Sequence, residues 1–119
     1  MDTFGKRIRP AVDAELHNAM LLNTEGRSHD GFRHLERAHV LGQASTAQHV
    51  RVHVHMLVWG WKQRSTREVL GQLLRIVGAA TKTAVGWIPA GNTGGSNVSP
   101  FKPMPIPQDL AKVLERAQL

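Results

Sequence analysis

The sequence predicts an all-α fold of four to five helices arranged as antiparallel hairpins. Apolar residues recur at helical spacing through most of the first two thirds of the chain. Helix-start signals divide this part into segments of helical length, and only a few residues separate one segment from the next. Because helices joined by such short connections pack as antiparallel neighbours, we expect a helical bundle or a set of tetratricopeptide-like helix pairs.

The first two helices are expected over residues 10–24 and 29–41. Pro10 suits the first turn of the first helix, because the N–H that proline lacks has no partner there in any case. Ser28 is the expected N-cap of the second helix, and Gly42 is well placed to end it.

The third and fourth helices are expected over residues 46–63 and 66–83. Each follows a capping box, in which a serine hydroxyl accepts a backbone N–H and a Gln or Glu side chain reaches back: Ser45 with Gln48, and Ser65 with Glu68. Residues 50–56 also alternate apolar and polar side chains, as a half-buried strand would. The preceding capping box and the further apolar residues up to Trp61 favour the helix.

The composition changes in residues 86–107, which hold five of the six prolines and four of the eleven glycines. A regular helix cannot run through them. Their large apolar residues predict a segment wrapped across the helices rather than a linker: Trp87, Ile88, Phe101, Met104 and Ile106. The GNTGGSN motif at 91–97 indicates tight turns, and residues 108–119 a short C-terminal helix. We expect Trp59, Trp61 and Trp87 to be packing residues.

Length, charge and composition exclude several classes of protein. The 119 residues suit a single domain over 1–119. A net charge of +6 would suit a nucleic-acid binder, but the cations are scattered and aromatic residues are not interleaved with them, so nucleic acid is not an expected partner. The chain has no cysteine and no apolar run of signal or membrane-spanning length. We therefore expect a cytoplasmic protein with no membrane partner.

The residues with the clearest chemical potential are histidines, five of which lie between His34 and His55. His49 and His53 are four residues apart, so they project from one helix face at the spacing by which two imidazoles can hold one metal ion. Glu36 and His39 have the Glu-x-x-His spacing that presents an oxygen and a nitrogen ligand in di-iron carboxylate bundles.

A helical hairpin would bring these two pairs together. With a turn near residue 43, Glu36, His39, His49 and His53 lie at about the same height on antiparallel helices, and Glu15 on the first helix is a further candidate ligand. Imidazole with carboxylate suits zinc, nickel, cobalt, iron or copper(II) and does not choose among them. The alternative for each histidine is a core or boundary residue satisfied by a hydrogen bond.

Several sequence motifs resemble a family of short proteobacterial proteins known only as a domain of unknown function. They are HLERAHVLGQ (34–43), HVRVH (49–53), REVLGQLLR (67–75), GNTGGSNVS (91–99) and PMPIP (103–107). This resemblance supplies no activity and no site residues. Residues 19–38 are also similar, more loosely, to a tetratricopeptide helix pair.

Three functions are compatible with these features. The leading prediction is an intracellular transition-metal-binding protein, acting in metal sequestration, sensing or delivery. The second is a helical-repeat interaction module whose groove binds a partner peptide, with histidines as polar groove residues. Besides a metal ion, the partners that we consider are another protein and a second copy in a homodimer. The third is a metal-dependent enzyme, which would need an open coordination position.

Overall fold

The computed structural model describes residues 3–84, 90–99 and 101–118, and within them the regular structure is entirely helical. The helices are α1 (Phe4–Thr24), α2 (Ser28–Gly42), α3 (Thr46–Lys62), α4 (Thr66–Ala84) and α5 (Gln108–Ala117). The predicted all-α fold is therefore confirmed, and residues 50–56 are helical rather than extended.

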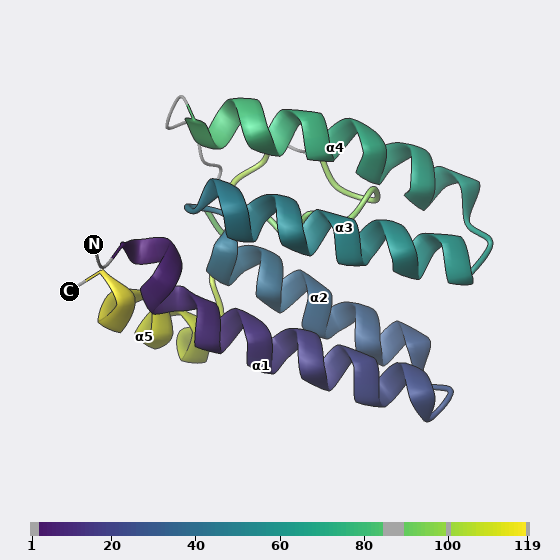
Figure 1. Cartoon of the computed structure of the whole chain (residues 1–119), viewed down its shortest axis with the longest axis horizontal. Coiled ribbons are helices and arrows are strands. Elements are labelled where there is room, and N and C mark those ends of the chain that lie inside the picture. The colour runs from purple at the N-terminus through teal and green to yellow at the C-terminus, as the bar shows by residue number, and fades with distance from the viewer. Residues whose placement is uncertain (1–2, 85–89, 100, 119) are drawn as a thin grey trace.

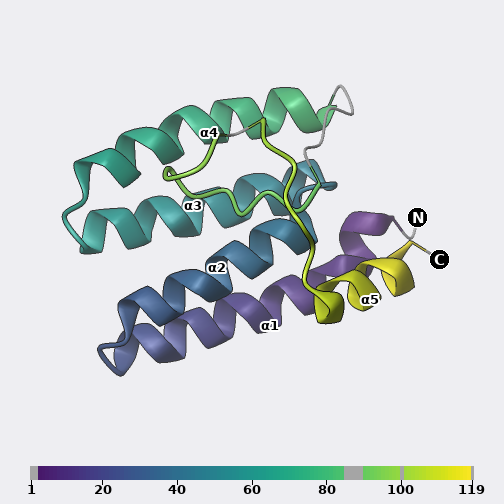
Figure 2. The ribbon, with the colours of Figure 1, turned by 180° about the vertical axis from the view of Figure 1, so that it is seen from behind.

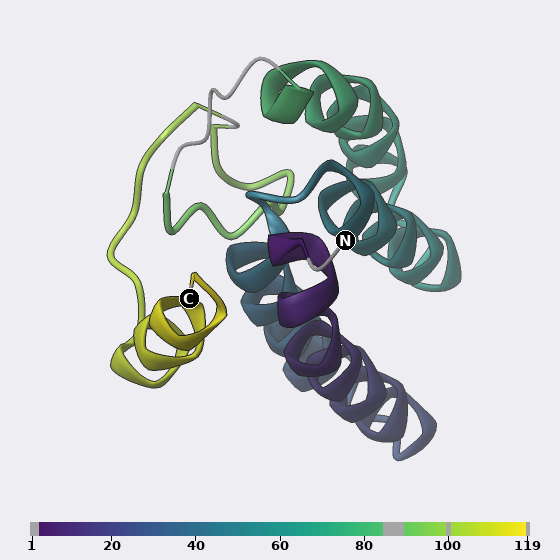
Figure 3. The same ribbon diagram turned by 60° about the vertical axis from the view of Figure 1, so that its left-hand side comes forward.

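The first four helices form two antiparallel hairpins laid side by side (Figure 1). Helix α1 packs mainly on α2, and α3 mainly on α4, while contacts between α2 and α3 join the two hairpins. Helix α5 lies against α1 and α2, on the far side of the molecule from α4 (Figure 3). Among the described helices, α4 contacts only α3, so it forms one edge of the stack.

The start of α1 differs from the sequence prediction by six residues. The helix begins at Phe4, and Thr3 is its N-cap, with the Thr3 hydroxyl accepting the Lys6 N–H at 3.3 Å. Pro10 consequently lies inside the helix instead of in its first turn. Its ring removes one backbone hydrogen bond without ending the helix.

The start of α2 also differs from expectation. Ser28 was the expected N-cap, but it is the first residue of the helix, and the cap position belongs to Arg27, which makes no side-chain cap bond. The Ser28 hydroxyl donates instead to the side chain of Gln63, at 3.3 Å. The helix ends at Gly42, as predicted.

The two predicted serine caps are present. The Ser45 hydroxyl accepts the Gln48 N–H at 3.4 Å, and the Ser65 hydroxyl accepts the Glu68 N–H at 3.2 Å. The Glu68 carboxylate, however, bonds to Gln72 and Ser96. The Glu68 carboxylate therefore joins α4 to residue 96 of the irregular segment instead of closing the predicted capping box.

The core lies between α1, α2 and α3 and is closed at one end by α5. Ile8, Val12, Leu41, Val52 and Met56 are all at most 1% exposed. Trp59 packs as predicted, with its indole N–H donating to the Ser28 carbonyl at 2.8 Å. The prediction for Trp61 is wrong, because its side chain is 75% exposed at the end of α3, and Trp87 lies outside the described residues.

The described part of the irregular segment crosses the molecule over α2, α3 and α4 before the chain enters α5 (Figure 2). We call its described part, residues 90–99 and 101–107, the strap. The strap folds back on itself, since the Met104 N–H donates to the Ala90 carbonyl at 2.9 Å. It also lies directly on α4, where a Cβ at Gly71 would be only 2.7 Å from the Ser96 Cβ.

The predicted wrapping of this segment is confirmed for the strap. Met104 and Ile106 are half-buried, and Ile106 packs against the core. Phe101 is 53% exposed, so it does not anchor the strap as expected. Trp87 and Ile88 lie outside the described residues.

Helix α5 is held by both apolar and polar contacts. Leu110 is 2% exposed in the core, and the Arg7 guanidinium donates to the Ala117 carbonyl at 2.7 Å, tying the start of α1 to the end of α5. Arg37 on α2 forms an ion pair with Asp109. This pairing raises the pKa of Arg37 and lowers the pKa of Asp109.

We predict that Leu110→Ala lowers the free energy of unfolding by about 2–4 kcal/mol, because it leaves a cavity where α5 meets the core. Urea denaturation followed by circular dichroism measures the change. Leu21→Ala is the matched control, since Leu21 is 45% exposed, and it should cost under about 1 kcal/mol. Equal losses in the two variants would show that α5 is not part of the cooperative core.

Candidate metal centre

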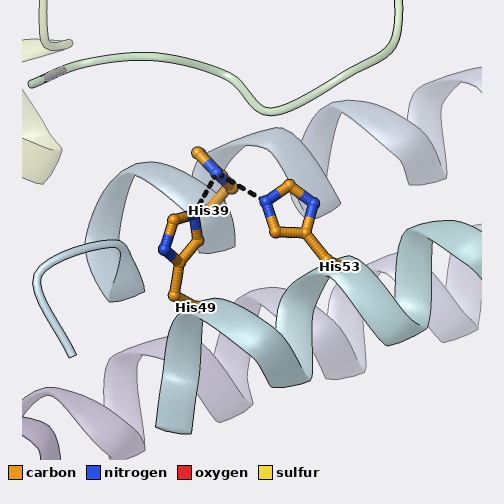
Figure 4. Close-up of side chains that lie close together, drawn as sticks. All are labelled: His39, His49 and His53. Atoms are coloured by element: carbon orange, nitrogen blue, oxygen red, sulfur yellow. Dashed lines mark hydrogen bonds between the residues drawn. The ribbon is translucent and has the colours of Figure 1, made fainter. Parts of the chain in front are cut away.

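Three buried histidines converge between α2 and α3 (Figure 4). The Nε2 atom of His39 lies 3.0 Å from Nε2 of His49 and 3.1 Å from Nε2 of His53. The three side chains are only 3%, 4% and 2% exposed, respectively. Within the described part of the chain, this is the one group of three or more His, Asp or Glu side chains whose ligand atoms come this close.

The chain brings these residues together through the short turn that the sequence predicts. His39 is in the last turn of α2, and His49 and His53 occupy successive turns near the start of α3. Gly42 lets the two helices approach at the turn, since a Cβ there would lie 3.0 Å from the Gln48 Cβ. The convergence of His39 with His49 and His53 therefore follows from hairpin geometry.

Hydrogen bonds outside the cluster fix the tautomers of two of its imidazoles. The Nδ1 atom of His39 lies 2.6 Å from the Asn92 carbonyl oxygen, and Nδ1 of His53 lies 2.5 Å from Oε1 of Gln72. Both partners are acceptors, so each Nδ1 carries the hydrogen and donates it. A neutral imidazole with its hydrogen on Nδ1 has a lone pair on Nε2.

The orientation of the Gln72 amide is itself determined by its surroundings. Its Nε2 group donates to Oε1 of Glu68 at 2.7 Å and to the Gly94 carbonyl at 3.0 Å, which leaves the amide oxygen to face His53. Glu68 is held in turn by the Ser96 hydroxyl and backbone N–H. A chain of bonds from the strap through α4 therefore orients His53.

In their neutral forms, His39 and His53 thus point two lone pairs at each other across 3.1 Å. Two acceptors at this distance repel each other unless a cation lies between them. A hydrogen on Nε2 of His49 can be donated to His39, but it does not lie between His39 and His53. The arrangement therefore requires an extra proton or a metal ion.

The spacing of the three nitrogens fits a single transition-metal ion. Nitrogens bound at about 2.0–2.1 Å around a tetrahedral zinc ion are about 3.3 Å apart. The two measured separations, 3.0 and 3.1 Å, are slightly shorter than this. Small outward movements of the rings would bring them to the bonding geometry.

The strap covers the cluster, and Gly94 is the residue that lets it approach. Gly94 has a φ of +82°, and a Cβ there would lie 2.4 Å from Cδ2 of His39. The Gly94 N–H donates to the side chain of Asn92, whose amide donates to the carbonyls of Ser99 and Lys102. The GNTGGSN motif thus forms the predicted tight turns, which position the Asn92 carbonyl beside His39.

Glu36, one of the two predicted carboxylate ligands, lies close to this strap but is not part of the convergent group. It is half-buried, and burial raises its pKa from the ordinary value of 4.5. The Thr93 hydroxyl and the charge of Arg33 oppose this shift, and the charge of Glu68 adds to it. Glu36 therefore remains a predicted ligand that the structure places near, but not in, the cluster.

Glu15, the other predicted carboxylate, belongs to a different cluster between α1 and α2. It accepts hydrogen bonds from Nδ1 of His34 at 2.6 Å and from Nε of Arg37 at 2.9 Å. The structure does not bring it together with the three histidines.

The remaining histidines lie outside the centre. His17, His29 and His55 are exposed. Burial lowers the pKa of His55, and the charge of Arg51 adds to this effect.

A protein-family model described as "Protein of unknown function (DUF3703)" matches residues 6–114. The chain belongs to this family. Searches of curated proteins and of solved structures each found no match. Within the described residues, no helix combines the length and the apolar character needed to cross a membrane.

Residues 6–114 include every residue of the centre, from His39 to Ser96. The sequence prediction missed the outer partners of the histidines: Glu68, Gln72, Asn92 and Gly94. Two sequence features marked these residues: the GNTGGSN motif, and the i, i+4 spacing of Glu68 and Gln72. Neither feature indicates that the residues face a histidine cluster, because their position depends on how α4 and the strap pack.

We predict that Gly94→Ala disrupts the centre, because the added Cβ meets the His39 ring and the backbone has a left-handed φ. Gly26→Ala separates these two causes. Gly26 has a similar φ of +78°, but a Cβ there has no atom within 4 Å. Urea unfolding should show a loss about 2 kcal/mol larger for Gly94→Ala. Equal losses would mean that the ring has room to move.

We also predict that Glu36→Gln raises the melting temperature of the metal-free protein at pH 7, by up to about 4 °C. A carboxyl whose pKa is raised by folding costs stability once it ionises, which happens above its unfolded pKa. The gain should disappear as the pH falls below that value, where both states are protonated. Melting curves at pH 7 and pH 3.5 measure it, with the exposed Glu115→Gln as control. A lower melting temperature at pH 7 would contradict the assignment.

Proposed function

We propose that this protein binds one transition-metal ion through Nε2 of His39, His49 and His53, and serves in intracellular metal sequestration, sensing or delivery. The observation that carries the proposal is the 3.1 Å separation between the Nε2 atoms of His39 and His53. Their Nδ1 hydrogens are committed to Asn92 and Gln72. A metal ion removes the resulting repulsion and keeps both outer hydrogen bonds.

A bound proton is the competing explanation for the same contacts. Protonation of His39 or His53 on Nε2 would also supply a donor, but it places a positive charge in a centre whose imidazoles are at most 4% exposed. One hydrogen bond would offset the desolvation cost of that charge, whereas three metal–nitrogen bonds offset the desolvation cost of a metal ion. Coordination by three nitrogens therefore favours the ion.

The closed character of the centre favours binding over catalysis. A catalytic metal site keeps one coordination position open to substrate. Here the strap lies over the cluster, and Gly94 touches the His39 ring. The metal-dependent enzyme consequently ranks below the metal-binding protein.

The ligand set leaves the identity of the ion open among zinc, nickel, cobalt, iron and copper. Three neutral imidazoles do not offset the charge of a divalent ion. The Glu68 carboxylate, which contacts His53 through Gln72, lies just outside the cluster, and a cation near Glu36 would lower the pKa of its carboxyl, against the effect of burial. We retain Glu36 as a candidate fourth ligand. Glu15 would first have to leave His34 and Arg37.

A groove between α1 and α3 favours the interaction module as a second candidate. Its walls include the exposed apolar residues Met20, Val54 and Val58. The histidines on this groove are His17 and His55. His39, His49 and His53 do not line it, so peptide binding would leave their convergence unexplained.

Calorimetric titration of the untagged protein with zinc, nickel, cobalt or copper(II) tests the proposal. We expect one ion per chain and a rise in melting temperature, because the ion prefers the native state. His49→Ala and His53→Ala should each weaken binding at least tenfold, since two imidazoles cannot close the site. His17→Ala and His55→Ala are matched controls on exposed positions and should bind normally.

Two results would reject the metal centre. One is a melting temperature that no metal changes at pH 7.5. The other is binding that His17→Ala or His55→Ala weakens as much as His49→Ala does, because ordinary surface histidines would then account for the heat.

A further inference from the structure

The outward face of α4 is largely apolar, with one exposed cation, Arg67, near its start. Four of its large side chains are strongly exposed: Leu70 57%, Leu73 48%, Leu74 76% and Val77 69%. Their spacing of three and four residues puts them on one stripe of the helix. Thr66 and Thr81, both exposed, end the stripe on either side. A stripe of this length on a soluble helix marks an interface.

The stripe is symmetric about the midpoint between Leu73 and Leu74. Two copies of α4 that cross antiparallel at this point place residue i opposite residue 147 − i. Leu73 then faces Leu74, Leu70 faces Val77, and Thr66 faces Thr81. Each large apolar residue meets another, and each polar end meets a polar end. An isologous two-fold interface requires this self-complementarity.

Charge is also compatible with a second copy in this register. Arg67, which lies beside Leu70 and Leu74 on this face, is opposite Ala80 of the other copy, and Lys82, just beyond Thr81, is opposite Ser65. The two other cations of the α3–α4 turn, Lys62 and Arg64, lie beyond the end of the stripe, so the two turns are at opposite ends of the pair. No like charges meet across the leucines, and no carboxylate is needed to balance them.

An anionic membrane or an acidic partner fits this face less well. Either would be recognised by cations that flank the apolar residues along their length. Lys62, Arg64 and Arg67 instead gather near one end of α4 and Lys82 lies at the other end, so that between Leu70 and Thr81 the sequence has one cation, Arg75. Arg75, farther along the helix, is turned toward the strap and donates to the Val98 carbonyl.

We propose that the protein forms a homodimer through antiparallel pairing of α4 about the Leu73–Leu74 midpoint. Trp61 extends the interface, since it is 75% exposed and lines a shallow pocket with Leu70. A specific interface buries about 800 Å² on each partner. An interface of this size has an apolar centre, which the stripe and Trp61 provide together with the residues that flank them. The dimer does not depend on metal binding.

Sedimentation equilibrium of the full chain at micromolar concentration tests the dimer. The expected mass is twice the 13.1 kDa of the chain. Leu74→Glu should weaken the dimer at least a hundredfold while the helical circular dichroism stays unchanged, because it buries two carboxylates near the two-fold axis. Leu21→Glu, on an exposed apolar residue of α1, is the control and should remain dimeric. A wild-type monomer up to about 100 µM would overturn the proposal.

Disulfide trapping tests the register, because the chain has no cysteine of its own. Leu73→Cys alone should cross-link under mild oxidation, since the two positions lie beside the axis. Thr66→Cys alone should not, but it should cross-link when mixed with Thr81→Cys. Cross-linking of Thr66→Cys with itself would indicate a parallel pair and contradict the proposal. Sedimentation of a monomer with phosphatidylglycerol vesicles would assign the face to a membrane and overturn it as well.

Discussion

The contact between His39 and His53 is the constraint on which the arrangement around it depends. Each imidazole donates its Nδ1 hydrogen outward, to Asn92 and to Gln72, so the inner nitrogens are left as acceptors. A helical hairpin alone could bring the rings close, but it could not choose their tautomers. That choice is made by α4 and the strap, and this explains why an irregular segment with so many glycines and prolines is packed onto a small helical domain.

The residues that surround the cluster form a layered arrangement. Glu68 orients the Gln72 amide, Gln72 orients His53, and Ser96 holds Glu68 in place. The Asn92 side chain closes the turn that presents its own carbonyl to His39. Buried polar groups are tolerated when their bonds are satisfied in this way, and a fully bonded network also limits the positions that each ring can take.

Sequence patterns predicted the parts of this arrangement that are local along the chain. The serine caps at Ser45 and Ser65 and the i, i+4 pair of His49 and His53 depend on neighbouring residues, and a short turn places His39 opposite this pair. The start of α1 was missed because Pro10 suits a first turn, whereas Thr3 supplies a cap that starts the helix six residues earlier, at Phe4. The roles of Gln72, Asn92 and Gly94 depend on contacts between segments 19 or more residues apart, which no local spacing encodes.

The backbone of the strap, more than its side chains, contacts the histidine cluster, through the carbonyl of Asn92 and the bare Cα of Gly94. An ion bound below it could leave only after the strap had lifted and the bonds to Gln72 and Glu68 had broken. The lifetime of the bound state would then be governed by the opening rate of a loop rather than by ligand strength. Such a protein could hold its ion for long periods at modest affinity, and whatever opens the strap would decide when the ion is released.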